Sequence, residues 1–172
     1  WGPGHEPTHL TYTANGGVGP DYVLELPNNT THDVLSNSVT GFTRDGYRFT
    51  GWNTQPDGTG YDLQPGDQVL VDRINETNNI LYAQWEQLLS LTATKGWNVP
   101  AGHVYPDVWF TLYRRNADNS VTLMETKQVP TTAPFTVTFS NLEPNNGAGY
   151  TYVYFVKETD ASGADYTPPN YT

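Results

Sequence analysis

An alternation of apolar and polar residues over positions 89–97 restricts the fold of this chain more than any other feature. Such a period of two predicts a half-buried β-strand, in which residues two apart share one face. The residues that share the apolar face are Leu89, Leu91, Ala93, Lys95 and Trp97. An amine on a core face must reach water at the sheet edge, pair with an acid or lose its charge. Lys95 is therefore the first candidate for a functional residue, in a chain with only three lysines.

Composition predicts a mainly β fold outside the cytosol. Aromatic residues make up 13% of the 172 residues, 16 glycines and 13 prolines supply turns, and no apolar run is long enough to cross a bilayer. The net charge of −10 disfavours binding to nucleic acid or anionic lipid. The absence of cysteine from a loop-rich chain favours a bacterial, Gram-positive surface, and the low lysine content argues against a cytosolic alternative. We expect a piece of a longer polypeptide.

The first half predicts short strands joined by turns after an N-terminal tail at residues 1–8. Strand patterns cover 10–14, 22–26, 42–52, 68–72 and 78–85. Residues 31–40 fit either a loop or a short helix capped near Asp33, and we expect Trp52, Tyr82 and Trp85 to fill a small core. A new strand pattern begins after Gln87, which places the boundary between two domains there.

Four motifs of the first half resemble the Listeria–Bacteroides repeat, the internalin B-type repeat family. They are Ala-Asn-Gly-Gly at 14–17, Thr-Arg-Asp-Gly-Tyr-Arg-Phe-Thr-Gly-Trp at 43–52, Leu-Gln-Pro-Gly-Asp at 63–67 and Leu-Tyr-Ala-Gln-Trp at 81–85. The resemblance covers roughly residues 9–87 and follows the order of the family. It implies a small β-grasp-like (α+β) module that serves as a spacer in a bacterial surface protein.

The second half, residues 88–172, predicts strands near 89–97, 108–115, 120–128, 134–141 and 149–158, a spacing typical of a β-sandwich. It resembles the collagen-adhesin B-type (Cna-B) domain. The resemblance rests on Thr-Lys-Gly-Trp at 94–97, Tyr-Pro-Asp at 105–107, Phe-Ser-Asn-Leu at 139–142 and Val-Lys-Glu at 156–158. Gly96 departs from the bulky residue that usually follows the lysine. The implied fold is an Ig-like or transthyretin-like β-sandwich. Two alternatives remain for its last strand: it lies outside this chain, or the domain closes differently.

The Cna-B resemblance implies an intramolecular isopeptide bond between a lysine and an asparagine. Lys95 would be the nucleophile, Glu158 the assisting acid and Asn170 the acceptor. Burial of both ionisable groups would favour their neutral forms, and packing would bring the reacting atoms together without another enzyme. Asn170 follows two prolines, which suit a strand poorly, so the acceptor strand could instead lie outside this chain. The alternative is a lysine that snorkels and pairs with Glu158 or Asp107.

The other patterns in the sequence give weaker evidence of a functional site. The four histidines lack the spacing of metal ligands and fit solvated loops, and Asp57, Asp62 and Asp67 lack the alternation of a calcium loop and fit turns. No nucleophile elbow or phosphate loop occurs. We therefore expect no metal, no cofactor and no catalytic turnover beyond a single autocatalytic bond formation.

The function expected from the sequence is that of a structural stalk of a cell-wall-anchored bacterial adhesin. The expected partners are other domains of the same protein, in a monomer without membrane insertion. Two alternatives remain: direct binding of a host protein or glycan through the aromatic-rich first half, and a pilin subunit. Lys127 and Lys157 show no motif for a pilin linkage.

Overall fold

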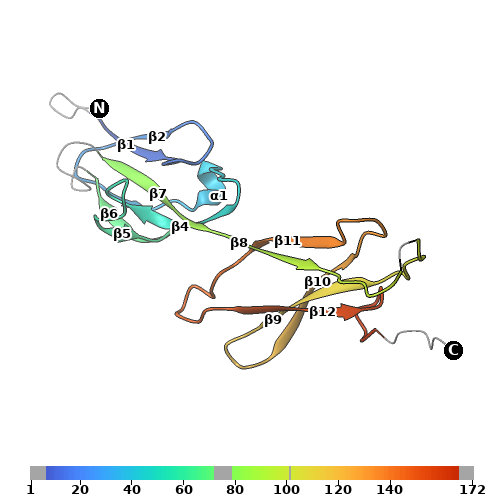
Figure 1. Ribbon diagram of the computed structural model, residues 1–172. Helices are drawn as coiled ribbons and strands as arrows, with labels where there is room; N and C mark the ends of the chain where they lie inside the picture. The colour runs from blue at the N-terminus through green and yellow to red at the C-terminus, as the bar shows by residue number, and fades with distance from the viewer. Residues whose placement is uncertain (1–6, 72–78, 101, 167–172) are drawn as a thin grey trace. The chain divides into compact units, whose positions relative to one another are not determined.

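The computed structural model describes residues 7–71, 79–100 and 102–166 and is mainly β (Figure 1). The chain divides into two compact units, Trp1–Gln87 and Leu88–Thr172. The described residues contain one helix, α1 (Asn37–Thr40), which is too short to span a membrane. The prediction of a mainly β fold is confirmed.

The first unit contains a five-stranded sheet with the order β2-β1-β7-β4-β5. Its strands are β1 (Thr8–Thr13), β2 (Tyr22–Leu26), β4 (Tyr47–Asn53), β5 (Asp62–Leu63) and β7 (Ile80–Gln87). Neighbours are antiparallel except β1 and β7, which run parallel. Two further strands, β3 (Thr31–Asp33) and β6 (Gln68–Leu70), pair with each other as a separate ribbon.

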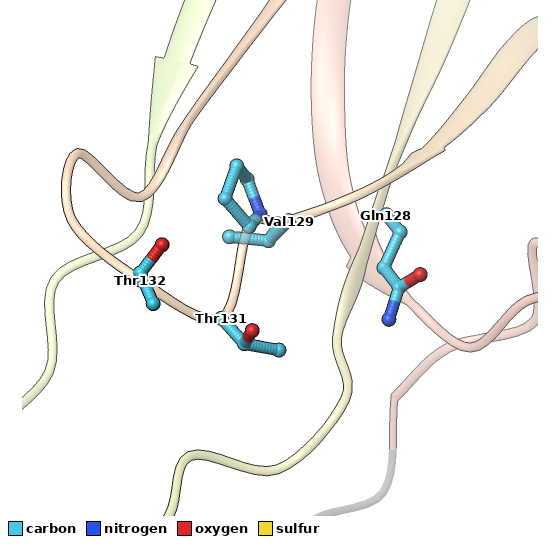
Figure 2. Close-up of a pocket in the computed structure, with 5 residues that line it drawn as sticks. Gln128, Val129, Thr131 and Thr132 are labelled. Carbon is cyan, nitrogen blue, oxygen red and sulfur yellow. The ribbon is translucent and has the colours of Figure 1, made fainter.

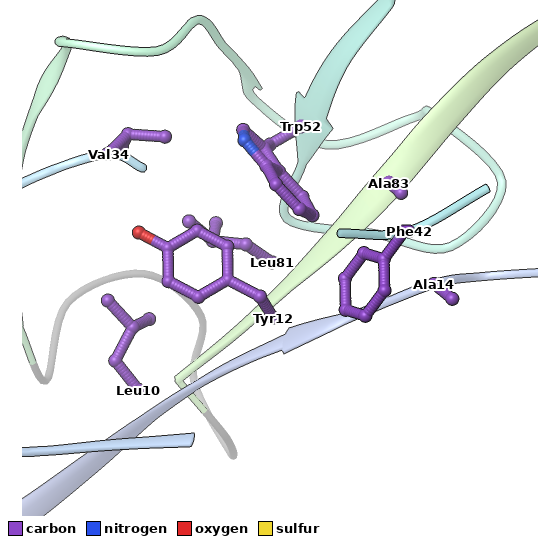
Figure 3. Close-up of a cluster of buried hydrophobic side chains, with 8 residues drawn as sticks. All are labelled: Leu10, Tyr12, Ala14, Val34, Phe42, Trp52, Leu81 and Ala83. Carbon is purple, nitrogen blue, oxygen red and sulfur yellow. The ribbon is translucent and has the colours of Figure 1, made fainter. Parts of the chain in front are cut away.

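An aromatic-rich core fills the first unit, as Figure 3 shows. Its buried members are Leu10, Tyr12, Ala14, Val34, Phe42, Trp52, Leu81 and Ala83. The ring centroids of Tyr12 and Trp52 are 4.8 Å apart in an edge-to-face arrangement, a favoured geometry for aromatic pairs. Trp52 Nε1 donates a hydrogen bond to the carbonyl oxygen of Leu35 at 2.8 Å, so the buried indole is satisfied.

A β-bulge in β4 lets two aromatic residues three positions apart reach the same core. The pairing of β4 with β7 shifts between Phe49 and Gly51, and the Phe49 and Trp52 ring centroids lie 4.9 Å apart. Gly51 has a φ of 145°, and a Cβ there would meet Gln64 Nε2 at 2.5 Å. A glycine therefore permits the bulge that a strict period of two does not predict.

Several local predictions for the first unit need correction. Thr8, which the sequence placed in the tail, begins β1. The helix alternative for residues 31–40 is correct only for α1, whose N-cap is Ser36 rather than Asp33, and β3 comes before it. Tyr82 is half-buried and outside the core cluster, because Leu81 and Ala83 occupy the inward positions of β7.

The second unit consists of a three-stranded and a two-stranded antiparallel sheet, an arrangement consistent with the expected β-sandwich. The larger sheet has the order β10-β9-β12, with β9 (Trp109–Arg115), β10 (Val121–Gln128) and β12 (Val153–Thr159). The smaller sheet pairs β8 (Leu89–Thr94) with β11 (Thr136–Leu142).

The core of the second unit draws buried residues from both sheets: Val108, Phe110, Leu112, Val129, Val137, Phe139 and Leu142. Leu91 and Ala93 of β8 pack against it, as the alternation predicts. Leu89 does not, because 44% of its surface is exposed. The core face of β8 thus begins at Leu91 and continues through Ala93 toward Lys95.

Candidate functional site

Lys95 extends the core face of β8 by one residue beyond the strand. Its backbone N–H donates to the carbonyl oxygen of Phe135 at 2.8 Å, which continues the pairing with the segment that leads into β11. This bond holds Lys95 in the register set by Leu91 and Ala93. The Lys95 side chain is 21% exposed, so it is largely covered but still in contact with water.

Glu158 approaches the amine from the other sheet. It lies on β12 opposite Phe110 of β9, on the face that also carries Tyr154 and Val156, which pack against the core. Lys95 Nζ and Glu158 Oε2 are 2.9 Å apart, within the range of a charge-assisted hydrogen bond. Because β8 and β12 belong to different sheets, this ion pair links the two layers of the second unit.

A cluster of three aromatic rings lies next to the amine through one of its members, Trp97. Trp97, Tyr105 and Phe135 contact one another, with ring centroids 4.8–6.2 Å apart. Lys95 Nζ lies 4.8 Å from the centroid of the Trp97 ring, within the range of a cation–π contact. We call Lys95, Glu158 and these three residues the amine site. The alternation predicts Trp97 on this face, and Phe135 belongs to the strand pattern predicted over 134–141, whereas Tyr105 comes from a segment without a regular pattern.

The exposure of the ion pair differs from the expectation of a deeply hidden amine and acid. The Glu158 side chain is 31% exposed, which is more than the exposure of the Lys95 side chain. An ion pair with this much water contact loses only part of its hydration. The amine site therefore combines close contact of the two groups with access from solvent.

Two other residues were considered from the sequence as partners of Lys95. Asn170, the candidate acceptor, lies outside the described residues. Asp107, the alternative partner of Lys95, instead accepts a hydrogen bond from Gln128 Nε2 at 3.0 Å. Of the two carboxylates weighed for Lys95, the structure brings Glu158 to the amine.

A shallow hollow of about 340 Å³ lies beside the loop after β10 (Figure 2). It is lined by Gln128, Val129, Pro130, Thr131 and Thr132. Small-molecule sites usually combine an apolar, often aromatic, wall with convergent polar groups. This lining has neither an aromatic nor a charged side chain, and Val129 belongs to the core. The hollow is a weak candidate for a ligand site.

The three aspartates that were considered as calcium ligands form local hydrogen bonds in the first unit. Asp57 Oδ1 accepts hydrogen bonds from the Thr59 N–H and hydroxyl, Asp62 Oδ1 accepts from Asn53 Nδ2 and Asp67 Oδ2 accepts from the Gln64 N–H. Among the described residues, no group of three or more acidic or histidine side chains is placed to hold a metal ion.

His32 needs a correction, because it lies on β3 rather than in a solvated loop. Its Nε2 is 2.9 Å from the buried Tyr12 hydroxyl, which also accepts the Leu35 N–H at 3.0 Å. Burial lowers the pKa of His32 from its usual 6.5, although the nearby Asp33 opposes this shift. Burial also raises the pKa of Tyr12 to about 12.

Comparison with known proteins places a Listeria–Bacteroides repeat domain at residues 9–84. The chain is 33% identical over 89 residues to a collagen adhesin of Staphylococcus aureus, a match that covers 51% of the chain. It is 51% identical over 43 residues to a putative Gly-rich membrane protein of Evansella cellulosilytica, a match that covers 25% of the chain. The matches span only 7% and 5% of these two relatives.

No solved structure matched the chain. The similarities support a Listeria–Bacteroides repeat at residues 9–84 together with an adhesin-like module. They relate the chain to surface-adhesin and membrane-associated proteins, which is consistent with an extracellular surface location.

Proposed function

We propose that this chain is a stalk segment of a bacterial cell-wall-anchored adhesin, and that its second unit is a Cna-B-like module that forms a lysine–asparagine isopeptide bond. The first unit would be a β-grasp-like spacer, and the partners would be other domains of the same protein. The observation that carries the proposal is the contact of 2.9 Å between Lys95 Nζ and Glu158 Oε2, which connects the two sheets.

The contact supports bond formation because it provides both the nucleophile and a proton carrier. Transfer of one proton from the Lys95 ammonium to the Glu158 carboxylate gives a neutral amine and a neutral acid. The amine can then attack the carbon of an acceptor carboxamide, while Glu158 delivers a proton to the departing nitrogen and receives the second proton from Nζ. One C–N bond forms, another breaks and ammonia leaves. The reaction occurs once per chain, so the protein is not a turnover enzyme.

Intact mass spectrometry of the full chain tests this proposal. A mass below that of the sequence by one ammonia is expected, together with a crosslinked peptide that contains Lys95. The variant Lys95→Met should show the full mass calculated from its own sequence. A wild-type chain whose mass equals that calculated from its sequence would reject isopeptide formation in this protein. The stalk would then depend on non-covalent contacts alone.

A second candidate function, direct binding of a protein partner, is favoured by one surface of the second unit. Val121 and Val153 flank Arg115 in adjacent strands and are 47% and 52% exposed. In the next row on the same face, Leu123 is 48% exposed and pairs with Tyr113. Contiguous apolar residues on a sheet face can mark an interaction surface. Loss of host-cell attachment in a Leu123→Lys variant with unchanged melting would favour binding over the stalk role.

A further inference from the structure

The ribbon of β3 and β6 is held to the first unit by packing and side-chain hydrogen bonds. Among the described strands, β3 and β6 pair only with each other, so no backbone ladder connects them to the five-stranded sheet. Val34, directly after β3, is buried in the core, and Val69 of β6 packs against it. His32 lies opposite Val69 in the ribbon, and its Nε2 is 2.9 Å from the hydroxyl oxygen of Tyr12 on β1. This side-chain contact joins the ribbon to the sheet.

The hydrogen bonds at the Tyr12 hydroxyl determine which nitrogen of His32 carries the hydrogen. The backbone N–H of Leu35 can only donate, and it donates to the Tyr12 oxygen at 3.0 Å. The one hydrogen of the hydroxyl then has His32 Nε2 as its acceptor. An imidazole nitrogen accepts only when it is unprotonated, so His32 is neutral, with its hydrogen on Nδ1. Tyr12 is 0% exposed, and Figure 3 shows its hydroxyl pointing to the side of the core where Val34 lies.

Protonation of His32 removes this acceptor. Nε2 would then carry a hydrogen and could only donate to the Tyr12 oxygen, which already accepts the Leu35 N–H. The hydrogen of the buried hydroxyl would be left without an acceptor, which is unfavourable for a polar group out of contact with water. The charged imidazole would also lose part of its hydration. Movement of His32 into water, together with β3, relieves both effects.

The charges around His32 do not offset this loss. Asp33, the next residue on β3, favours the charged imidazole, but burial has the larger effect, and the pKa of His32 is lowered from 6.5. The Asp33 carboxylate also accepts a hydrogen bond from Gln68 Nε2 of β6 at 3.2 Å, and β6 itself carries no ionisable side chain. On the sheet side, burial raises the pKa of Tyr12 to about 12, so Tyr12 is uncharged at acid pH, and Tyr22 of β2 contacts the Tyr12 ring.

We propose that His32 is an acid-sensitive attachment point, which holds the β3–β6 ribbon on the sheet at neutral pH and releases it when the imidazole is protonated. This inference concerns the first unit and depends neither on the isopeptide bond nor on the stalk role. Release would withdraw Val34 from the core and separate the Leu35 N–H from the Tyr12 hydroxyl. The ladders that join β1, β7 and β4 do not include the ribbon and would remain paired.

Native-state hydrogen exchange of the full chain over a series of pH values tests this inference. Protection factors correct for the intrinsic effect of pH on exchange. The amides of Val34 and Leu35, which donate to Asp67 O and the Tyr12 hydroxyl, report the ribbon, and those of Leu81 and Ala83 report β7. The ribbon amides should have lower protection factors than the β7 amides and should exchange through an opening that is insensitive to low denaturant concentrations. Linkage predicts that this opening becomes more frequent by up to about tenfold per pH unit between pH 6.5 and the folded-state pKa of His32, and that it levels off below that pKa.

Two matched variants separate His32 from other acid effects. His32→Gln supplies a carbonyl oxygen that can accept the Tyr12 hydrogen and does not titrate, so the acid response of the ribbon should disappear. His9→Gln makes the same substitution at an exposed histidine of the same unit, which is 3.9 Å from Glu25, and should respond to acid as the wild type does. An acid response that persists in His32→Gln would overturn the inference. Equal protection factors for the ribbon and β7 amides would also overturn it, because the ribbon would then open only when the whole unit unfolds.

A measurement on the wild type covers the case in which His32→Gln does not fold. In ¹⁵N-labelled protein at neutral pH, the chemical shifts of the imidazole nitrogens should identify Nδ1 of His32 as the protonated nitrogen and Nε2 as the acceptor. A hydrogen on Nε2 at neutral pH would refute the hydrogen-bond assignment on which the attachment depends.

Discussion

Removal of the ion pair between Lys95 and Glu158 should destabilise the second unit by an amount between those for an exposed and a buried pair. The two atoms are 2.9 Å apart, and the side chains are 21% and 31% exposed. Exposed pairs contribute about 0.2–1 kcal/mol, whereas hydrogen bonds to charged groups contribute about 1.5–3 kcal/mol. The intermediate exposure leads us to expect a coupling energy of about 1–2 kcal/mol. For a unit of this size, that energy corresponds to roughly 5–15 °C in Tm.

A double-mutant cycle measures this coupling directly. The variants Lys95→Met, Glu158→Gln and their combination keep the approximate volume of each side chain, and denaturant unfolding gives the free energy of unfolding of each. The pair of Lys157 and Asp165 is the matched control, because its atoms are 3.8 Å apart and its side chains are 52% and 86% exposed. The cycle Lys157→Met with Asp165→Asn should give a coupling energy below about 0.5 kcal/mol.

The reasoning fails if the two pairs couple equally, because the link between the sheets would then contribute no more than a surface contact. Salt provides a second check. An ion pair open to water weakens at 1 M salt, where the Debye length falls to about 3 Å. A covalent bond does not weaken, so a large coupling energy that is independent of salt would indicate that the isopeptide has formed. The intact mass must therefore be determined before the cycle is interpreted.

Two further predictions concern the first unit. The pKa of His32 is below 6.5 in the folded state, so the unfolded chain binds this proton first as the pH falls. The contribution of His32 to the free energy of unfolding should therefore be complete above pH 6.5 and decrease between pH 6.5 and the pKa of the folded state. Denaturant unfolding of wild type and His32→Gln over this pH range checks the sign, and an equal decrease in both proteins would contradict the role of His32. Gly51→Ala should lower the free energy of unfolding by about 1–3 kcal/mol, because it strains a residue with φ of 145° and displaces Gln64. An unchanged unfolding midpoint would contradict this account of the bulge.

The contact between Lys95 and Glu158 is predictable because each strand carries a simple pattern. Alternation with Leu91 and Ala93 places Lys95 inward on β8, and alternation with Tyr154 and Val156 places Glu158 inward on β12. Periodicity shows that both side chains face a core but not that they meet. The resemblance to the Cna-B domain supplied that step.

The sequence pattern does not show where the backbone departs from a period of two. The bulge between Phe49 and Gly51 brings Trp52 to the core side, and a second shift between Phe139 and Leu142 buries both of those residues. A bulge depends on the partner strand and on one residue with an unusual φ, such as Asn141 at 59°. The fully buried Tyr12 was missed for another reason: its hydroxyl is satisfied by groups distant in the sequence, His32 and Leu35.

The partial exposure of the amine site favours the neutral amine and acid less than complete burial would, but it leaves access for an acceptor. An acceptor carboxamide must reach the Lys95 amine, and a dry, closed core has no space for an additional side chain. The Lys95 and Glu158 side chains instead remain 21% and 31% exposed. One incoming carboxamide could therefore reach the amine from solvent and cover it. Under the proposed reaction, the site would be complete only when the acceptor is present, and the mass of the intact chain decides whether that state is reached.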